Sequence, residues 1–284
     1  MTALRVLATG PLALVQDLGR PGLAAQGVSR SGAADRAALR LANRLVANPE
    51  DAAAIEATLG GLQVRAEADL LVALAGAAAP AVLDGTPVGH HAVLRLPAGS
   101  VLRLGAPAAG LRTYLAVRGG ITVPAVLSSR STDVLSGLGP DPLAVGVVLP
   151  VGPAPEAYPE VAQAAVAVPG GGLVRLRALR GPRAGWVADV DALTTRAWTA
   201  SARSNRVGMR LEGHRLTRSR TEELPSEGLV RGAVQVPPGG EPVLFLADHP
   251  VTGGYPVVAV VLDADVDRAA QVRPGQQLRL YWVG

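Results

Sequence analysis

The stretch RSGAADRAALRLANRLVANP, residues 30–49, differs from the sequence on both sides of it. The chain around it consists mainly of short apolar runs separated by Gly and Pro, whereas this stretch is charged and rich in Ala. Its apolar residues recur at positions 38, 41, 42, 45 and 46, which form one face of an amphipathic helix. Asp35 suits the first helical turn, and Pro49 cannot continue a helix. We therefore predict a helix over residues 35–48.

Strand signals dominate the rest of the chain. The apolar runs are short, and turn signals separate them, which is the pattern of barrels and sandwiches. The runs predicted to form strands are residues 5–8, 12–15, 62–66, 70–75, 81–83, 92–96, 101–104, 112–116, 145–149, 173–179, 208–212, 232–235, 243–246, 257–261 and 277–281. Shorter helical turns are predicted at 189–197 and 265–270. The predicted fold class is mainly β, with a few short helices.

Both halves of the chain repeat one local pattern, in which a Pro-containing tight turn leads into an apolar strand. The pattern occurs as LPAGSVLRL (96–104), VPPGGEPVLFL (236–246) and VRPGQQLRL (272–280). Residues 150–172 are rich in Pro and end in three Gly residues, which is typical of a linker. We predict an N-terminal β-barrel domain over residues 1–165, containing the helix 35–48, and a C-terminal β-barrel domain over residues 166–284.

The composition excludes several kinds of chemistry. The 284 residues include no Cys, which excludes disulfides, thiol nucleophiles and thiolate metal sites. They include no Lys, which excludes Schiff-base chemistry, a P-loop lysine and biotin carried covalently on this chain. His90 and His91 are adjacent and would point apart on a strand, so they do not have the spacing of metal ligands. We predict no metal.

The charge pattern limits the possible partners. The formal net charge is +4, but the Arg residues are dispersed and aromatic residues make up only 3% of the chain, so we expect no nucleic-acid partner. The longest uncharged apolar stretch, residues 70–83, contains Pro80 and is too short to span a bilayer. The first residues contain no sustained apolar run of the kind found in signal peptides. We expect a cytoplasmic protein without a membrane partner.

Gly and polar residues gather in five stretches, of which QDLGRPG (16–22) is the first. Asp17 and Arg20 could pair within an ordinary turn, or the carboxylate could hold the Arg so that its rigid fork of donors meets an anion. The second stretch, GVSRSGAAD (27–35), places Ser31 and Asp35 at the start of the predicted helix. These residues could simply cap the helix, or the helix N-terminus could bind an anion or a polarised carbonyl.

The third stretch is YLAVRGGITVPAVLSSRSTDVLSG (114–137), where Arg118 follows a strand and Arg130, Ser131 and Thr132 cluster. Hydroxyls and an Arg can bind a carboxylate or a phosphate, although a surface turn has the same composition. The fourth stretch, SARSNRVGMRLEG (201–213), contains Arg206 and is equally typical of a solvated hairpin.

The fifth stretch, LADHPVTGGYP (246–256), follows a strand that its apolar residues predict to be buried. His249 could titrate near neutral pH, although an isolated His is more often structural. The Gly pair in Thr252, Gly253, Gly254 and Tyr255 lets the backbone approach a ligand closely. From the residues alone, the loops suit a small anionic or amide ligand, and no particular reaction is indicated.

In chain order, four blocks resemble the family of 5-oxoprolinase C subunits, which is also called allophanate hydrolase subunit 2-like or biotin-dependent carboxyltransferase-like. The blocks are GPLALVQDLGRPGLAAQGVSRSGAADRAALRLANRLVANPEDAAAIEATLGG, YLAVRGGITVPAVLSSRST, SNRVGMRLEG and VTGGYPVVAVVLDADVDRAAQVRPGQQLRL. Asn205 stands where the family pattern has Asp, Val251 where it has Thr, and Ser128 where it has Gly. The first departure removes a carboxylate and weakens a general-base role at position 205.

The resemblance implies cyclophilin-like β-barrels in a hetero-oligomer with the B-like and A-like subunits of a 5-oxoprolinase. Such a complex would cleave 5-oxo-L-proline to L-glutamate with ATP, and the chain alone is expected to be inactive. One alternative is a carboxyltransferase component that moves a carboxyl group from carboxybiotin to a urea-like acceptor. Another is a non-catalytic regulator that binds its B-like partner.

Within that resemblance, the residues expected to act fall into two groups. Ser31 and the helix N-terminus would form an oxyanion-type site, and Asp35 or His249 would transfer protons. The residues expected to contact substrate are Asp17, Arg20, Arg118, Arg130, Ser131, Thr132, Arg206, Thr252, Gly253, Gly254 and Tyr255. ATP is expected in the complex.

Overall fold

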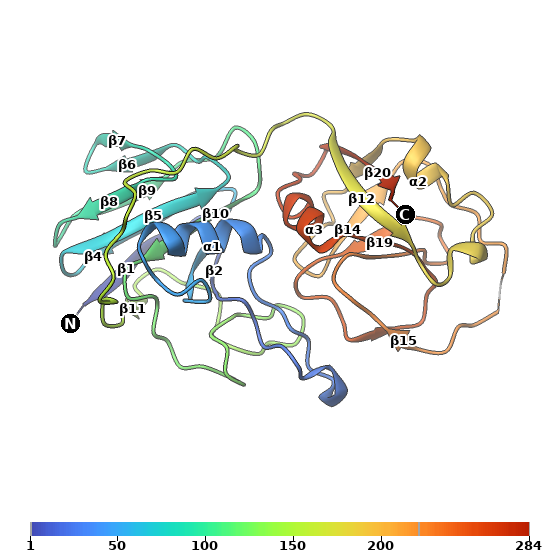
Figure 1. The fold of residues 1–284 in the computed structure, drawn as a ribbon, viewed down its shortest axis with the longest axis horizontal. Helices are drawn as coiled ribbons and strands as arrows, with labels where there is room; N and C mark the ends of the chain where they lie inside the picture. The colour runs from blue at the N-terminus through green and yellow to red at the C-terminus, as the bar shows by residue number, and fades with distance from the viewer. Residues whose placement is uncertain (1, 221, 284) are drawn as a thin grey trace. The chain divides into compact units, whose positions relative to one another are not determined.

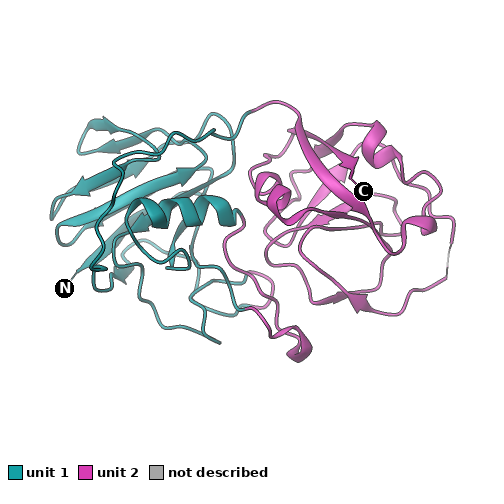
Figure 2. Ribbon diagram, viewed as in Figure 1, with its two compact units in different colours: residues 1–20, 35–133, 137–170 teal, residues 21–34, 134–136, 171–284 magenta. Residues whose placement is uncertain are grey.

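The computed structural model describes residues 2–220 and 222–283, and the chain divides into two compact units (Figure 2). The first unit consists of residues 1–20, 35–133 and 137–170, and the second of residues 21–34, 134–136 and 171–284. The chain is built mainly from strands with few short helices, which confirms the predicted fold class. No helix in the described ranges is long and apolar enough to cross a membrane.

The first unit contains a six-stranded and a five-stranded antiparallel sheet (Figure 1). In spatial order, the six-stranded sheet consists of β11 (Val148–Pro150), β1 (Ala3–Thr9), β4 (Leu62–Ala66), β9 (Val101–Leu104), β6 (Ala81–Leu83) and β7 (Thr86–Val88). The five-stranded sheet consists of β2 (Leu12–Gln16), β3 (Ala54–Thr58), β10 (Arg112–Val117), β5 (Leu70–Gly76) and β8 (Val93–Leu96).

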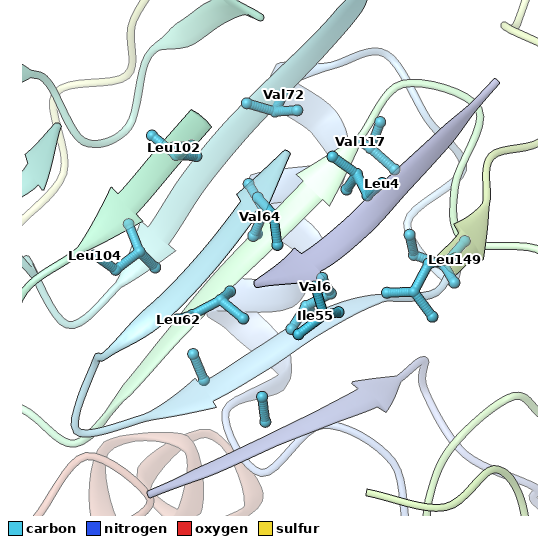
Figure 3. Close-up of a cluster of buried hydrophobic side chains, with 14 of the residues drawn as sticks. Leu4, Val6, Ile55, Leu62, Val64, Val72, Leu102, Leu104, Val117 and Leu149 are labelled. Atoms are coloured by element: carbon cyan, nitrogen blue, oxygen red, sulfur yellow. The ribbon is translucent and has the colours of Figure 1, made fainter. Parts of the chain in front are cut away.

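One hydrophobic core joins the two sheets. On β4, Leu62, Val64 and Ala66 are buried while the residues between them are partly exposed, as the period of two in a strand requires. Figure 3 shows side chains of both sheets in this cluster, among them Val64 of β4 and Ile55 of β3. Because aromatic residues make up only 3% of the chain, Leu, Val, Ile and Ala supply the core.

The helix α1 (Arg36–Leu45) lies against β5 and β10 of the five-stranded sheet (Figure 1). Every residue of β10 is buried, because Leu115 and Val117 belong to the core between the sheets while Tyr114 contacts the start of α1. The strand therefore has an apolar environment on both faces, and α1 provides one of them.

The helix ends earlier than the predicted range 35–48. Ala47 takes a left-handed φ of 55°, which turns the chain away from the helix axis. Asn48 then donates to the Val117 carbonyl at 2.7 Å and accepts from the Gly119 N–H at 2.8 Å. Side-chain contacts with the end of β10 thus terminate α1 before Pro49 can do so.

A buried polar network fixes the start of α1. Asp35 caps the helix, because its Oδ1 accepts from the Ala38 N–H at 2.9 Å. The Asp35 N–H donates to the Tyr114 hydroxyl at 2.8 Å, and this hydroxyl donates to Glu56 Oε2 at 2.6 Å. Burial, together with the charge of Glu56, raises the pKa of Tyr114 well above its ordinary value, so the hydroxyl keeps the proton that it donates.

The second unit contains a closed barrel. Its strands are, in order around the barrel, β12 (Val174–Arg180), β19 (Val257–Val261), β16 (Ala233–Gln235), β17 (Val243–Phe245), β14 (Gly208–Glu212), β13 (Trp198–Ala200) and β20 (Gln277–Trp282). The parallel pair β12 and β20 closes the ring. The remaining elements are the ribbon β15 (Glu227–Gly228) and β18 (Thr252–Gly253), the helices α2 (Ala192–Thr195) and α3 (Asp263–Ala269), and the 3-10 turns η1 (Ala24–Gln26) and η2 (Ala184–Trp186).

Asp265 fastens α3 to the barrel. Its side chain is 1% exposed, and its carboxylate accepts from the Arg177 N–H at 2.7 Å and from Arg177 Nε and Nη2 at 2.9 Å. Burial alone would raise the pKa of Asp265, but the hydrogen bonds from Arg177 outweigh burial and hold the pKa below its ordinary value.

Asp265→Asn should lower the free energy of unfolding by about 1–3 kcal/mol at pH 7, because it removes the charged acceptor of Arg177 at a buried position. A carboxyl group with a depressed pKa stabilises the folded state above its unfolded pKa, about 4, and this stabilisation is lost as the pH falls through the folded pKa. The variant should therefore lose less stability than wild type between about pH 5 and pH 2. Urea unfolding across this range measures both effects.

The control is Asp191→Asn, because the Asp191 side chain is 62% exposed in its ion pair with Arg180. This variant should lower the free energy of unfolding less at pH 7. Identical acid-side slopes in wild type and Asp265→Asn would contradict this role.

Candidate functional site

Asp17 lies directly after β2, and its carboxylate accepts hydrogen bonds from residues 129–131 of the same unit. Its Oδ1 accepts from the Gly19 N–H at 2.7 Å and from the hydroxyls of Ser129 and Ser131 at 2.7 and 2.5 Å. Its Oδ2 accepts from the Arg130 N–H at 2.6 Å. The stretches QDLGRPG and SSRST thus form one polar cluster, although Asp17 and Ser129 are 112 residues apart in sequence. We call Asp17, Arg20, Ser129, Arg130 and Ser131 the Asp17 cluster.

Arg20 is buried in this cluster at 1% exposure, and main-chain carbonyls surround its guanidinium. Nη2 donates to the Ser131 carbonyl at 2.6 Å, and Nε lies 3.4 Å from the Val126 carbonyl oxygen. Nη1 is buried and has no hydrogen-bond partner among the described residues. Gln16 Oε1 is also buried without one, although Gln16 Nε2 donates to the Thr132 carbonyl at 2.8 Å. One donor and one acceptor therefore remain open on side chains that are anchored to neighbouring carbonyls.

Arg130 and Thr132 hold the loop around this cluster. Arg130 Nε donates to the Val123 carbonyl at 2.8 Å, and the Thr132 hydroxyl donates to the Pro140 carbonyl at 2.8 Å. The structure thus brings together five of the residues predicted to contact substrate, namely Asp17, Arg20, Arg130, Ser131 and Thr132. In this structure, most of their polar atoms fix one another and the loop.

A second buried cluster lies in the second unit, and we call Ser31, Arg206 and Asp248 the Asp248 cluster. Arg206 and Asp248 are 2% and 0% exposed and form a two-pronged ion pair, with Nε–Oδ2 at 2.8 Å and Nη2–Oδ1 at 2.9 Å. The Ser31 hydroxyl donates to Asp248 Oδ1 at 2.7 Å. Arg206 Nη2 also donates to the Gly32 carbonyl at 2.6 Å, and the Val134 N–H donates to Asp248 Oδ2 at 3.1 Å.

Ser31 and Asp35 are close in sequence but belong to different units. Ser31 has a left-handed φ of 53°, and its hydroxyl reaches Asp248. Asp35 places its own carboxylate at the start of α1 as the cap. The sequence singled out Ser31 and Arg206 but not Asp248 as the residue that joins them. The available signal was a charged residue directly after the apolar strand in LADHP.

The residues 249–255 adjoin the ribbon of β15 and β18. His249 is 9% exposed, and its Nδ1 lies 2.8 Å from the Pro250 carbonyl oxygen. Thr252 and Gly253 form β18, and a Cβ at Gly253 would come within 2.8 Å of the Gln235 side chain. Gly254 and Tyr255 are exposed. A side chain at position 253 would therefore displace the end of the Gln235 side chain.

Arg118 has different partners from the Asp17 cluster. Its Nη1 donates to the Val46 carbonyl at 3.0 Å, and its Nη2 donates to the carbonyls of Pro155 and Ala157 at 2.5 and 2.6 Å. The guanidinium carbon lies 5.0 Å from the centre of the Tyr158 ring. Arg118 thus supports the loop that follows β11.

The chemistry that these groups offer is hydrogen bonding to oxygen. A guanidinium N–H donates well to a carbonyl or carboxylate oxygen, because the bond is charge-assisted. Within residues 2–220 and 222–283, no group of three or more His, Cys, Asp or Glu side chains is placed to hold a metal ion.

Removing one partner of the ion pair between Arg206 and Asp248 should strongly destabilise the second unit. Asp248→Asn should lower the free energy of unfolding by about 3–5 kcal/mol, since it leaves a buried guanidinium without its counter-charge. Arg206→Met combined with Asp248→Leu should cost less, because both charges are removed. Glu241→Gln, at a pair with the exposed Arg203, is the control. Urea unfolding would refute this role if Asp248→Asn and Glu241→Gln were equally stable.

Comparison with known proteins covers nearly the whole chain. Residues 26–282 match the family model described as carboxyltransferase domain, subdomain A and B. The 5-oxoprolinase C subunit of Escherichia coli is 42% identical over 97% of this chain and 89% of its own length. The 5-oxoprolinase C subunit of Haemophilus influenzae is 34% identical over 94% of this chain and 87% of its own length.

Longer proteins contain a similar region. The urea amidolyase of Saccharomyces cerevisiae is 30% identical over 98% of this chain, which spans 16% of that protein. The crystal structure of the K. lactis urea amidolyase matches 99% of this chain and 19% of its own, with a TM-score of 0.92 and 28% identity. The crystal structure of TTHA0988 matches 99% of this chain and 55% of its own, with a TM-score of 0.90 and 35% identity. The family model and these relatives together show that this chain belongs to the carboxyltransferase domain family, subdomain A and B, which includes the 5-oxoprolinase C subunits.

Proposed function

We propose that this chain is the C subunit of an ATP-dependent 5-oxoprolinase, which converts 5-oxo-L-proline to L-glutamate together with A-like and B-like subunits. The observation that carries the proposal is the 42% identity to a 5-oxoprolinase C subunit over 89% of that protein. The urea amidolyases are less similar, at 30–31% identity, and the match spans only 16–17% of their length.

The proposed reaction has to activate a lactam, whose resonance makes the carbonyl carbon a poor target for water. The lactam oxygen attacks the γ-phosphorus of ATP, and ADP leaves. Water adds to the activated carbon, the ring C–N bond breaks as the nitrogen takes up a proton, and γ-glutamyl phosphate forms. A second water releases phosphate and gives glutamate. The protein must therefore position the lactam oxygen as a nucleophile and stabilise the negative charge of the phosphoryl group that it receives.

Arg20 Nη1 and Gln16 Oε1 are a donor and an acceptor, which are the two kinds of atom that an amide edge pairs with. Arg20 Nη1 would donate to the phosphoryl group once it is on the lactam oxygen, and Gln16 Oε1 would accept from the ring N–H. A donor fixed in advance at such a site is typically worth roughly 3–4 kcal/mol in the transition state. Arg130, Ser131 and Thr132 would act by holding Arg20 and its loop in place.

In the second unit, we assign proton transfer to His249. Its Nδ1 lies 2.8 Å from the Pro250 carbonyl oxygen, and imidazole is the side chain whose ordinary pKa suits proton transfer near neutral pH. We do not assign this role to Asp35, because its carboxylate caps α1. Ser31 would present its oxygen beside the Arg206–Asp248 pair, with Thr252–Tyr255 as a neighbouring binding segment.

A second candidate function is carboxyl transfer from carboxybiotin on another protein to a urea-like acceptor. The family model and the urea amidolyase relatives favour it. The chain has no Lys, so a biotin carrier would have to be a separate protein. This reaction would depend on bicarbonate and be blocked by avidin, whereas lactam cleavage would need neither bicarbonate nor biotin.

Co-purification of this chain with A-like and B-like subunits should give ATP hydrolysis that depends on 5-oxoproline and yields glutamate. Arg20→Gln should lower kcat/KM by about 100- to 1,000-fold, because it removes a charged donor to the transferred phosphoryl group. Arg103→Gln, at an exposed position of β9, is the matched control and should have wild-type activity.

Thermal unfolding and size-exclusion chromatography of each variant complex would separate lost chemistry from lost folding. The proposal fails if the wild-type complex hydrolyses ATP without responding to 5-oxoproline, or if avidin abolishes turnover. The role of Arg20 fails if folded, assembled Arg20→Gln keeps its kcat/KM.

A further inference from the structure

The first unit contains a pocket of about 500 Å³ where β5 begins and β8 ends. The apolar part of its lining consists of Leu70, Leu71, Leu96, Pro97, Pro153 and Ala154. A concave site of this size with mainly apolar walls is typical of small-molecule binding.

The charged lining of the pocket favours an anion. Arg95 and Arg118 contribute two guanidinium groups, and Asp69 contributes one carboxylate, whose Oδ1 accepts from the Ala98 N–H at 2.8 Å. The contacts of Arg118 with main-chain carbonyls and with the Tyr158 ring fix one wall. Arg95 is exposed on β8 and is therefore available to a ligand.

The pocket is separate from the Asp17 cluster. Neighbouring strands of the five-stranded sheet are antiparallel, so the end of one strand lies beside the start of the next. The ends of β2 and β10 therefore lie beside the start of β3, and the ends of β10 and β8 lie beside the start of β5. Both sites therefore lie at the same end of the five-stranded sheet. Three strand spacings separate β2 from β5, which amounts to about 14 Å. No residue of the Asp17 cluster lines the pocket.

We propose that this pocket binds a small organic anion with a planar apolar body, such as an aromatic carboxylate. The carboxylate pairs with Arg95, and the ring lies on the leucine side chains next to Tyr158. Such a ligand uses both properties of the lining, since a neutral ring would leave Arg95 unpaired and a bare carboxylate would leave the apolar wall in water.

Benzoate, benzamide and acetate are probes that separate these two contributions. Titration of the isotope-labelled full chain, followed by amide NMR shifts, gives both the affinity and the position of binding. Benzoate should shift the amide signals of Leu71, Leu96 and Ala154. Benzamide lacks the charge and acetate lacks the ring, so each should bind about tenfold more weakly or worse.

The sequence VLRL occurs in both β8 and β9, which provides a matched pair of variants. Arg95→Gln should weaken benzoate binding about tenfold, and Arg103→Gln, outside the pocket, should leave the affinity unchanged. Tyr158→Ala should weaken binding, and Tyr281→Ala, at an exposed Tyr of β20, should not. Absence of benzoate binding, equal affinity for benzoate and benzamide, equal losses in both Arg variants, or shifts away from the pocket would overturn the proposal.

Discussion

A guanidinium can be buried only where oxygen atoms surround it, and this requirement shapes both units. The chain has no Lys, so Arg is the one type of side chain in it that stays positively charged at neutral pH. Arg20 is buried among carbonyls of the loop that follows β10, whereas Arg206 is buried against Asp248 and the Gly32 carbonyl. In each case the oxygens come from stretches far away in sequence. Burying the Arg therefore also fixes a long-range connection, and stretches that the sequence allowed as surface turns or a solvated hairpin become buried.

The two arginines differ in how their charge is balanced, and this difference has a chemical consequence. Asp248 neutralises Arg206 directly, so the Asp248 cluster is complete as a structural ion pair. Arg20 is met by carbonyl dipoles, which solvate the guanidinium without cancelling its charge, and Nη1 stays open. The Asp17 carboxylate is occupied by hydroxyl and main-chain donors. The Asp17 cluster is therefore the one of the two that retains positive charge for a ligand oxygen.

Local periodicity predicted much of the fold, and long-range chemistry accounts for what it missed. The strands predicted at 62–66, 208–212 and 257–261 have the observed bounds of β4, β14 and β19. Strand β3 was missed because Glu56 interrupts its apolar run, and the buried partner Tyr114 that makes this carboxylate acceptable is remote in sequence. The early end of α1 has the same cause, because it depends on the contact of Asn48 with a distant strand. The connection of Ser31 to Arg206 likewise depends on Asp248, which no local pattern identifies as their partner.

The proposed reaction places a further demand that the Asp17 cluster cannot meet alone. Arg20 Nη1 and Gln16 Oε1 would recognise an amide edge, and a urea-like acceptor presents the same edge as a lactam. The group that distinguishes 5-oxoproline is its carboxylate, which needs its own cation. Arg95 is on β8, four strand spacings or about 19 Å from β2, which is farther than a five-membered lactam can reach. On the proposed function, the carboxylate of 5-oxoproline would therefore pair with a cationic group other than Arg95.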